Sequence, residues 1–452
     1  MASSRKSKSA DLTAVVAAAL RPRISQGANL LLGLSGGIDS LVLLDLLVRL
    51  APEMRFSLQV LHVNHGISPN AGNWAAFCME RCRELGVPFS TETVDIGPYR
   101  ALGIEGAARQ ARFEAFARMP TDFIVLAQHR DDQVETVLLN LARGAGVRGL
   151  SGMPVSRSVN DSGATLLRPL LGASRQSIEA YARERGLQWV VDESNANLML
   201  RRNFIRERIV PDFESVFPAF RDSVVLGAAN LAEAGVLLDQ LADLDLAVAV
   251  RADALHVRTL GELGEARSRN ALRRWCELRG APWPGSPRLT EVLRQARVAR
   301  DDAVMAVSCR EWTFRRYRGL LYLDRQPGLA GADFSEPWNA EPAVPLMALG
   351  GVLRCKPELG RGLSAARLRL QRASLQLRLR RGGERLRVGA ARPHRSLKNL
   401  FQESGIPPWR RDRVPLIYCG GELVCVPGLG ESSDWQAGEG EPGVIASWEP
   451  FR

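Results

Sequence analysis

A short run of glycine and hydroxyl residues beside one acidic residue is the first place where residue types and spacing suggest chemistry. The run is Ser35-Gly36-Gly37-Ile38-Asp39-Ser40, and it lies between apolar stretches at 29–34 and 41–47. A glycine turn between a strand and a helix leaves free backbone N–H groups at the helix N-terminus, where they bind phosphate. The alternative is an ordinary glycine-rich turn. The phosphate interpretation assigns nucleotide binding to Ser35, Gly36, Gly37, Ile38, Asp39 and Ser40.

Asp39 is unusual in an anion site, because its carboxylate would repel a phosphate. A Mg²⁺ ion between the two removes the repulsion, since proteins often hold Mg²⁺ with one carboxylate and phosphate oxygens. We therefore expect Asp39 to be a metal ligand. A Walker loop is excluded, because no lysine follows these glycines. The pattern resembles the pyrophosphate loop (PP-loop) of the N-type ATP pyrophosphatases, which implies ATP as the nucleotide.

Two further polar clusters follow apolar runs that are predicted to be strands. One is His62-Val63-Asn64-His65-Gly66, and the other extends from Gln128 to Thr136. Because the carboxyl ends of parallel strands meet at one edge of a sheet, we expect both clusters to converge with the glycine loop. The alternative is that these histidines are core or surface residues. From this convergence we expect the nucleotide to contact His62, Asn64, His65 and His129.

Pairs of like charges occur on two predicted helices. Asp132 and Glu135 are three residues apart and share a helix face, which suits a metal or an ammonium group. The alternative is a pair of carboxylates stabilised by the helix dipole. Arg109 and Arg112 are also one turn apart, so their guanidinium groups can hold phosphate or developing negative charge. We expect Arg109 to act with the two carboxylates in catalysis and Arg112 to contact the nucleotide.

The elements that must position these residues alternate along the first half of the chain. This order predicts an α/β fold with a doubly wound parallel sheet, PP-loop and Rossmann-like, and with the site at the carboxyl ends of its strands. The predicted strands are 29–34, 58–63, 89–94 and 123–127, and the predicted helices are 41–47, 73–85, 104–117 and 132–141.

Length and composition indicate a soluble protein with several domains. The chain has 452 residues, of which 46% are hydrophobic and 24% charged, so two or three domains are expected. No uninterrupted apolar run approaches the roughly 20 residues of a membrane span. The basic, serine-rich start has no signal-peptide core after it, which favours a disordered tail on a cytoplasmic protein. Seven cysteines, an odd number, argue against a disulfide framework, and we interpret Cys78 and Cys82 as structural.

The positive charge is concentrated near the C-terminus. The whole chain carries a net charge of +11, and residues 371–413 contain twelve Lys or Arg and three Asp or Glu. A concentrated basic segment indicates a polyanionic partner, for which RNA is the natural candidate. The alternative is a solvated face in an arginine-rich protein, because only four of the basic residues are lysines.

With these motifs together, the chain resembles the tRNA(Ile)-lysidine synthase family. The likeness covers about the first half of the chain and a C-terminal segment from Arg381 to Gly430, whereas 227–328 is assigned by position only. The first-half motifs are the glycine loop, His62–Gly66, Glu105–Phe113, His129–Thr136, Asn140–Gly146, Gly149–Met153, Arg168–Leu171, Asp192–Asn195 and Arg202–Arg206.

The resemblance implies a specific reaction on the wobble cytidine of an isoleucine tRNA with the anticodon CAU. ATP, with Mg²⁺, would adenylate the C2 carbonyl oxygen, and the amine of free L-lysine would then attack C2 and release AMP. Asp132 and Glu135 would receive the cationic lysine. The residues implied to contact the tRNA, or nucleotide phosphate, are Arg202, Asn203, Arg206, Arg395, Lys398, Arg410 and Arg411. An amphipathic helix with exposed arginines is the alternative for 202–206.

The expected organisation has four parts. A disordered or helical tail at 1–25 precedes a PP-loop ATP pyrophosphatase domain at 26–215. A helical linker and mostly helical middle tRNA-binding domain follow at 216–335, and a small α+β basic tRNA-binding domain at 350–440. No membrane association is expected. The oligomeric state stays open, with a homodimer as one alternative, as do the basis of anticodon discrimination and the group that takes the proton from lysine.

Three rival functions share some of these features. A PP-loop tRNA thiolase uses the same adenylation, but Cys78 and Cys82 are spaced C-x-x-x-C and no cysteine lies near 129–136. Amidotransferase-like synthetases of small molecules lack a basic C-terminal RNA module. A non-enzymatic RNA-binding protein would not need Asp39, Asp132 and Glu135.

Overall fold

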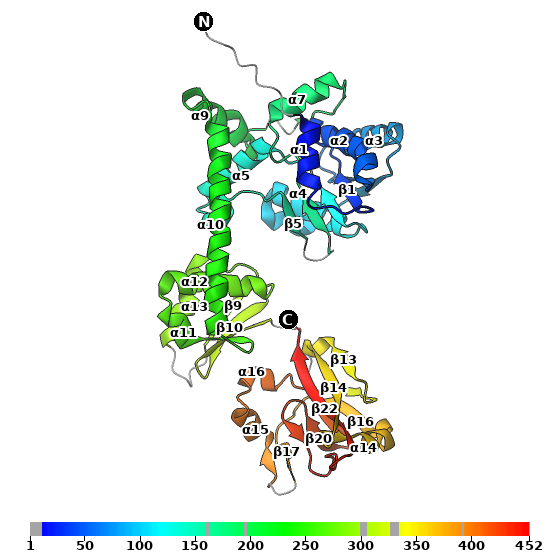
Figure 1. Cartoon of the computed structure of the whole chain (residues 1–452), viewed down its shortest axis with the longest axis vertical. Coiled ribbons are helices and arrows are strands. Elements are labelled where there is room, and N and C mark those ends of the chain that lie inside the picture. The colour runs from blue at the N-terminus through cyan, green and yellow to red at the C-terminus, as the bar shows by residue number, and fades with distance from the viewer. Residues whose placement is uncertain are drawn as a thin grey trace. The chain divides into compact units, whose positions relative to one another are not determined.

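The computed structural model shows a chain of two units, each of which is described by itself (Figure 1). Unit 1 comprises Met1–Leu237 and unit 2 Leu238–Arg452. The structure describes residues 11–159, 163–193, 197–298, 305–325, 334–389 and 393–451. Most of the predicted N-terminal tail, and Ser194 and Asn195 of the Asp192–Asn195 motif, lie outside the described residues.

Unit 1 is built on a six-stranded sheet with the order β3-β2-β1-β4-β6-β5. All neighbours pair in parallel except β5, which is antiparallel to β6. The strands are β1 Asn29–Gly33, β2 Ser57–Asn64, β3 Phe89–Thr93, β4 Phe123–Val125, β5 Ser156–Ser158 and β6 Thr165–Leu167. The predicted doubly wound α/β fold is confirmed, and the four predicted strands are β1 to β4. Sequence reasoning missed β5 and β6.

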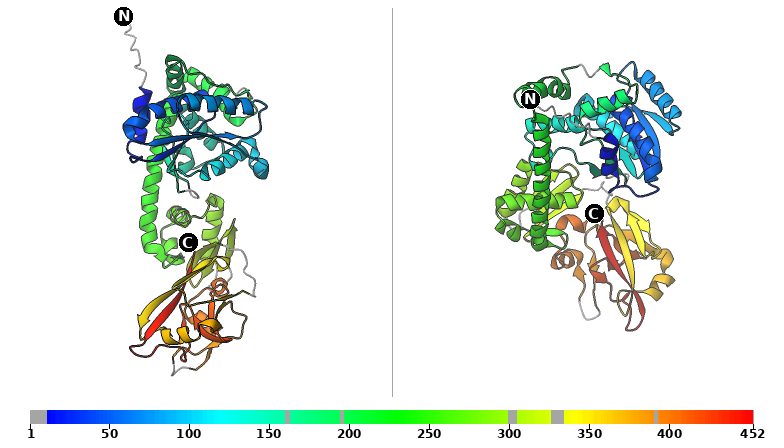
Figure 2. Two further views of the ribbon diagram at one scale, coloured as in Figure 1. Left: turned by 90° about the vertical axis from the view of Figure 1, so that its right-hand side faces the viewer. Right: turned by 45° about the horizontal axis from the view of Figure 1, so that its top comes forward.

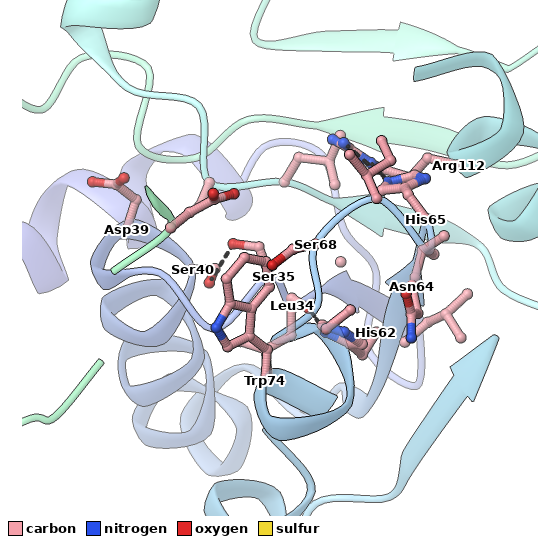
Figure 3. Close-up of a pocket in the computed structure, with 18 of the residues that line it drawn as sticks. Leu34, Ser35, Asp39, Ser40, His62, Asn64, His65, Ser68, Trp74 and Arg112 are labelled. Carbon is pink, nitrogen blue, oxygen red and sulfur yellow. Dashed lines mark hydrogen bonds between the residues drawn. The ribbon is translucent and has the colours of Figure 1, made fainter. Parts of the chain in front are cut away.

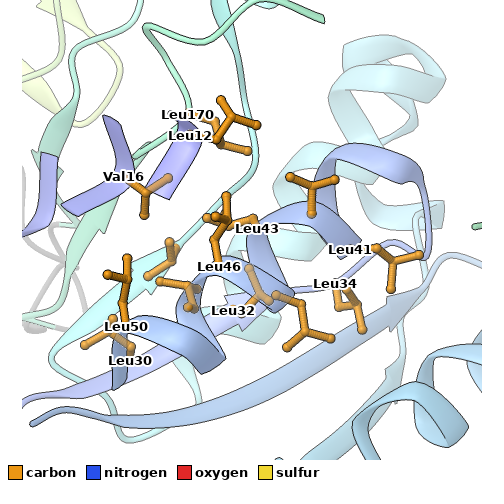
Figure 4. Packing of buried hydrophobic residues seen from close by; sticks show 14 of the residues in the cluster. Leu12, Val16, Leu30, Leu32, Leu34, Leu41, Leu43, Leu46, Leu50 and Leu170 are labelled. Atoms are coloured by element: carbon orange, nitrogen blue, oxygen red, sulfur yellow. The ribbon is translucent and has the colours of Figure 1, made fainter. Parts of the chain in front are cut away.

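Helices cover both faces of this sheet, because the strands are apolar on both sides (Figure 2). Leu30 and Leu32 of β1 belong to a buried cluster with residues of α1, α2 and α7 (Figure 4). Leu31 points to the opposite face and packs with Phe116 of α4. Alternate residues of one strand therefore anchor two separate layers of helices, which fixes the position of the loop that follows β1.

The helical elements of unit 1 include each helix that the sequence predicted. They are α1 Leu12–Leu20, α2 Ile38–Met54, α3 Ala71–Glu84, η1 Gly97–Leu102, α4 Gly103–Ala117, α5 Arg130–Ala142, α6 Val147–Leu150, α7 Arg175–Glu184, α8 Arg201–Phe204, η3 Ile205–Ile209 and α9 Val210–Val216. The segment η3 is a π-helical turn. Helix α10, Phe220–Ala249, begins in unit 1 and ends in unit 2.

The first part of unit 2 contains the expected helices and, in addition, an antiparallel sheet that the sequence did not predict. The helices α11 Val257–Glu262, α12 Glu265–Leu278 and α13 Ser286–Val298 pack on this sheet through a common buried cluster. Its strand order is β7-β8-β11-β10-β9. The strands are β7 Val250–Arg251, β8 Ala254–His256, β9 Ala306–Cys309, β10 Trp312–Tyr317 and β11 Leu320–Arg325.

The remainder of unit 2 is the small α+β part that the sequence predicted. Two antiparallel sheets have the orders β12-β16-β19-β20-β21 and β13-β14-β22-β15, and β17 pairs with β18. The strands are β12 Ser335–Pro337, β13 Ala343–Leu346, β14 Gly351–Leu359, β15 Leu363–Ser364, β16 Leu375–Arg378, β17 Arg385–Leu386, β18 Arg395–Ser396, β19 Leu416–Cys419, β20 Glu422–Val426, β21 Gly430–Glu431 and β22 Pro442–Pro450. The helices are η4 Met347–Leu349, α14 Ala365–Leu370, η5 Arg372–Ser374, α15 Leu397–Glu403 and α16 Pro408–Arg411.

Helix α10 is, by length and composition, the one helix in the described ranges that is apolar enough to cross a membrane. The sequence analysis considered uninterrupted apolar runs, and α10 is not one. Acidic side chains interrupt the helix at Asp222, Glu233, Asp239, Asp243 and Asp245. A single helix of this kind is weak evidence for a membrane span.

Gly33, the last residue of β1, is closely enclosed by the core. A Cβ atom there would lie 2.7 Å from Leu126 Cδ2 and 2.7 Å from Phe116 Cζ. We expect Gly33→Ala to lower the free energy of unfolding by about 1–3 kcal/mol, because both neighbours must move. Calorimetric melting of the whole chain would measure the shift. Gly172→Ala is the matched control, since its Cβ would meet open space, and equal melting of the two variants would contradict the prediction.

Candidate active site

The three polar clusters line one cavity of about 410 Å³ at the carboxyl ends of β1, β2 and β4 (Figure 3). Their convergence follows from the sheet order, since β1 lies between β2 and β4. The lining contains nine of the predicted site residues, namely Ser35, Asp39, Ser40, His62, Asn64, His65, Arg112, Asp132 and Arg202.

Ser35, Asp39 and Ser40 of the glycine loop line this cavity, whereas Gly36, Gly37 and Ile38 are not among its lining residues. Gly36 has φ of +86°, and a Cβ there would lie 2.7 Å from Val190 Cγ2, so the position requires glycine. Helix α2 begins at Ile38, and its N-cap residue Gly37 makes no side-chain cap. Ser35 Oγ and Ser40 Oγ are 3.1 Å apart, and Ser40 Oγ donates to Gly37 O over 2.9 Å. The loop therefore combines two hydroxyl groups with uncapped N–H groups of a helix N-terminus, which suits a phosphate.

His62 and His65 differ in role. His62 is buried, and its Nδ1 lies 2.9 Å from Leu34 O, so the ring ties the end of β2 to the loop. His65 lies beside Arg112, whose Nε donates to His65 Nε2 over 3.4 Å. Burial, and then the charge of Arg112, lowers the pKa of His65 to about 4. A neutral His65 can accept the guanidinium hydrogen bond. Asn64 closes a local turn by accepting the N–H of Gly66 over 2.8 Å.

Arg175, which sequence reasoning did not single out, holds the predicted metal ligand. Its Nη1 donates to Asp39 Oδ2 over 2.7 Å and to Oδ1 over 2.9 Å, while its Nε donates to Glu179 Oε1 over 3.0 Å. Burial raises the pKa of Asp39, although His129 and Arg175 oppose this shift. The only sequence signal for Arg175 was its place after the Arg168–Leu171 motif, because arginine is common throughout this chain.

His129 caps α5 and joins three carboxylates. The Asp131 N–H donates to His129 Nδ1 over 3.2 Å, which leaves Nε2 facing Asp39 and Asp132, each 3.6 Å away. Burial disfavours the charged ring, but Asp131, Asp132 and Asp39 outweigh burial and raise the pKa of His129. The backbone N–H of His129 donates to Asp132 Oδ2 over 3.0 Å. His129 therefore connects carboxylates at the carboxyl edge of the sheet, and it is not among the residues that line the cavity.

Glu135 and Asp132 share a face of α5 as predicted, but two arginines occupy that face. Arg206 Nε donates to Glu135 Oε1 over 2.5 Å, and Arg206 Nη2 lies 3.7 Å from Asp132 Oδ1. Arg202 Nε lies 3.0 Å from Glu135 Oε2. The Glu135 side chain is only 2% exposed. Burial raises the pKa of Glu135, and Arg206 opposes the shift.

Arg109 and Asn203 lie outside the cavity lining. The Arg109 guanidinium packs over the ring of Phe113, with 5.2 Å between its Cζ and the ring centroid. Burial and the nearby Arg157 lower the pKa of Arg109. Asn203 is buried and donates to Asn197 O over 3.0 Å. This bond anchors the segment between Arg202 and Arg206.

The four residues of unit 2 that were predicted to contact tRNA differ in exposure and in the partners they already have. Lys398 is exposed, and Arg395 pairs with Glu403. Arg410 is 19% exposed and pairs with Asp324 and Asp253, so its charge is already balanced within unit 2. Arg411 Nε donates to Ile406 O over 2.8 Å. Sequence counting treated these residues alike because it does not show which arginines already have carboxylate partners.

Trp74, which sequence reasoning also missed, lines the cavity. It lies on α3, where a lone aromatic residue is more often part of a core. Only the packing of α3 beside β2 brings this indole to the cavity, where an aromatic ring can stack on a base.

Comparison with known proteins identifies the family. A PP-loop domain model matches residues 8–213, a TilS substrate binding domain model 255–322, and a TilS substrate C-terminal domain model 375–448. The tRNA(Ile)-lysidine synthase of Nitrosomonas europaea is 38% identical over 452 residues, covering 100% of this chain and 98% of the relative. That of Azoarcus sp. is 38% identical over 430 residues, covering 94% and 93%.

The chain belongs to the tRNA(Ile)-lysidine synthase family. This membership confirms the resemblance inferred from the motifs. Among solved structures, the U34-tRNA thiolase NcsA from Methanococcus maripaludis has a TM-score of 0.41 at 20% identity, covering 49% of this chain and 78% of the thiolase. At this TM-score and identity, the likeness to the thiolase says nothing about the function of this chain.

The lowered pKa of His65 makes a prediction about stability. Between pH 6.5 and about 4 an unfolded histidine binds a proton that folded His65 does not, so the free energy of unfolding falls as the pH falls. We expect the loss of stability between pH 7 and pH 5 to be smaller in His65→Gln than in the wild type. Calorimetric melting at both pH values tests this, with the exposed His394→Gln as control. A larger loss in His65→Gln would contradict it.

Proposed function

We propose that this chain ligates free lysine to C2 of the wobble cytidine in isoleucine tRNA with the anticodon CAU, forming lysidine. ATP adenylates the C2 oxygen with release of pyrophosphate, and the lysine amine then displaces AMP. One observation carries the proposal. Within a chain whose relatives along its full length are lysidine synthases, the phosphate loop and the strand-end clusters line a single cavity.

The cavity can hold ATP through residues of this chain alone. The uncapped N-terminus of α2 and the hydroxyls of Ser35 and Ser40 would bind the phosphates that leave as pyrophosphate. Arg112 lines the cavity and hydrogen-bonds to a neutral His65, so its positive charge is available to a phosphate or to the developing oxyanion. Trp74 is placed to contact the base.

Asp39 fits a single-carboxylate magnesium site. No cluster of three metal-ligating side chains occurs in the described parts of the chain, so the remaining ligands would be phosphate oxygens and water. Asp39 lines the cavity beside the loop, which is where such an ion would lie. Bound Mg²⁺ would neutralise phosphate charge during adenylation. Arg175 balances the carboxylate in the present structure and would have to share or release it.

Asp132 and Glu135 are the proposed site for the cationic lysine. They are carboxylates of α5 that pair with Arg202 and Arg206, and Asp132 also lines the cavity. The tRNA would lie along the arginine-rich 201–208 segment and on the basic surface of unit 2, where Lys398 is exposed. A homodimer and a cytoplasmic location stay predictions.

A thiolase reaction is disfavoured by the cysteines. All seven are buried. Burial raises the pKa of Cys78 to about 12 and that of Cys82 to about 11, so neither is a ready thiolate nucleophile. The test of function is incubation of the full chain with ATP, labelled lysine and the CAU-anticodon isoleucine tRNA, followed by nucleoside analysis. Lysidine is the expected product, and a thiolated nucleoside or no product would refute the proposal.

Asp39→Asn is expected to slow pyrophosphate release about 100-fold or more, because loss of a metal-organising carboxylate removes several kcal/mol of transition-state stabilisation. Binding of tRNA should persist. Glu53→Gln, an exposed charge loss on the same helix, is the control. Pyrophosphate release at the wild-type rate would show that Asp39 does not hold a metal.

Glu135→Gln is expected to raise the KM for lysine about 10-fold or more, and to raise it more than the KM for ATP, because a hydrogen bond to a charged group is lost. Steady-state assays with each substrate varied in turn measure both values. The exposed Glu207→Gln is the control. An equal rise in both KM values would instead indicate a metal-binding or structural role.

A further inference from the structure

The carboxylate pair proposed to bind lysine is covered by an arginine of the same chain. Arg206 contacts both members of the pair, with its Nε on Glu135 and its Nη2 toward Asp132. A lysine ammonium would need the same two carboxylates. Two cations cannot share one place in a half-buried pocket, because they repel and overlap. Arg206 and lysine are therefore mutually exclusive occupants.

A second observation shows that the pair is incompletely satisfied. Within the described part of the chain, the buried Glu135 Oε2 accepts no hydrogen bond, although Arg202 Nε lies 3.0 Å away as an ion-pair partner. A buried carboxylate oxygen without a donor is costly, so the site favours a ligand that can donate to it. A primary ammonium has three donors that are free to turn, unlike the planar guanidinium.

The surroundings of Arg206 indicate what could remove it from the pair. Its side chain is 37% exposed whereas that of Glu135 is 2% exposed, so an outside anion can reach the arginine but not the carboxylate. Residues 201–208 contain four arginines and one acidic residue. Arg206 also lies in the π-helical turn η3, a form found mostly as single turns and often at functional sites. A phosphate of the bound RNA is the anion that this basic segment would meet.

We infer that Arg206 keeps lysine out of its site until a phosphate group of the tRNA draws the arginine away from Glu135 and Asp132. This inference rests on the proposed function and adds an order of binding to it. One cation replaces another at the carboxylates, so the exchange leaves the charge of the pocket unchanged. Lysine binds weakly while Arg206 is in place, because only the fraction of molecules with Arg206 displaced can accept it.

The test measures lysine binding to the full chain by equilibrium dialysis, without ATP. We expect the isoleucine tRNA with the anticodon CAU to raise the lysine affinity of the wild type by between about 5-fold and about 150-fold, the usual range of coupling between sites. By reciprocity, lysine should raise the tRNA affinity by the same factor. A parallel measurement with a non-hydrolysable ATP analogue in place of tRNA distinguishes a phosphate of the tRNA from a phosphate of ATP. Full tightening by the analogue alone would overturn the role of tRNA.

Variants of Arg206 separate this gate from a direct lysine contact. Arg206→Gln should bind lysine more tightly than the wild type without tRNA, and tRNA should add little. Arg206→Lys keeps a cation at the pair and should retain weak binding without tRNA. Arg21→Gln, an equal charge loss at an exposed position after α1, should leave the lysine affinity without tRNA unchanged.

The following outcomes would overturn either the inference or the proposed function. Weaker or unchanged lysine binding by Arg206→Gln, with a wild-type circular dichroism spectrum, overturns the inference. If Arg206→Gln fails to fold, tight lysine binding by Arg206→Lys without tRNA overturns it instead. A wild type that makes lysidine but shows no coupling also overturns it and leaves the proposed function intact, whereas failure to make lysidine with any tRNA refutes the proposed function itself.

Discussion

Charge balance at the carboxyl edge of the sheet is the constraint on which the site of unit 1 depends. Four carboxylates are gathered there because the end of β4, the loop after β1 and the start of α5 meet at one edge. Burial makes each carboxylate costly unless a cation faces it. The carboxylates are Asp39, Asp131, Asp132 and Glu135, and the facing cations are Arg175, Arg202, Arg206 and Arg221.

This balance means that a cation binding at these carboxylates would compete with an arginine that already pairs with them. The proposed metal at Asp39 would have to share or replace Arg175, and the proposed ammonium group at Glu135 would have to replace Arg206. In each proposed exchange a cation would take the place of a guanidinium group, so the buried carboxylates would keep a positively charged partner.

In unit 2 the net charge of a segment is a poor guide to which side chains are available. Arg410 lies against Asp324 and Asp253, and Trp409 donates from its indole nitrogen to Asp324 over 2.7 Å. The ring of Tyr322 packs edge-on against Trp409. These contacts join α16 to the sheet of the preceding region, so part of the basic segment stabilises unit 2 internally. Lys398, by contrast, is exposed.

The sequence by itself determined the doubly wound sheet, the phosphate loop and the three polar clusters, because alternating apolar runs and a glycine turn are local patterns. It also showed that Asp132 and Glu135 share a helix face, since that follows from helical spacing. Only the tertiary structure decided which charges meet: Arg175 at Asp39, Arg206 at Glu135 and Arg410 at Asp324. Such pairs join residues far apart in the chain, and in a protein with so many arginines no spacing rule selects the partner.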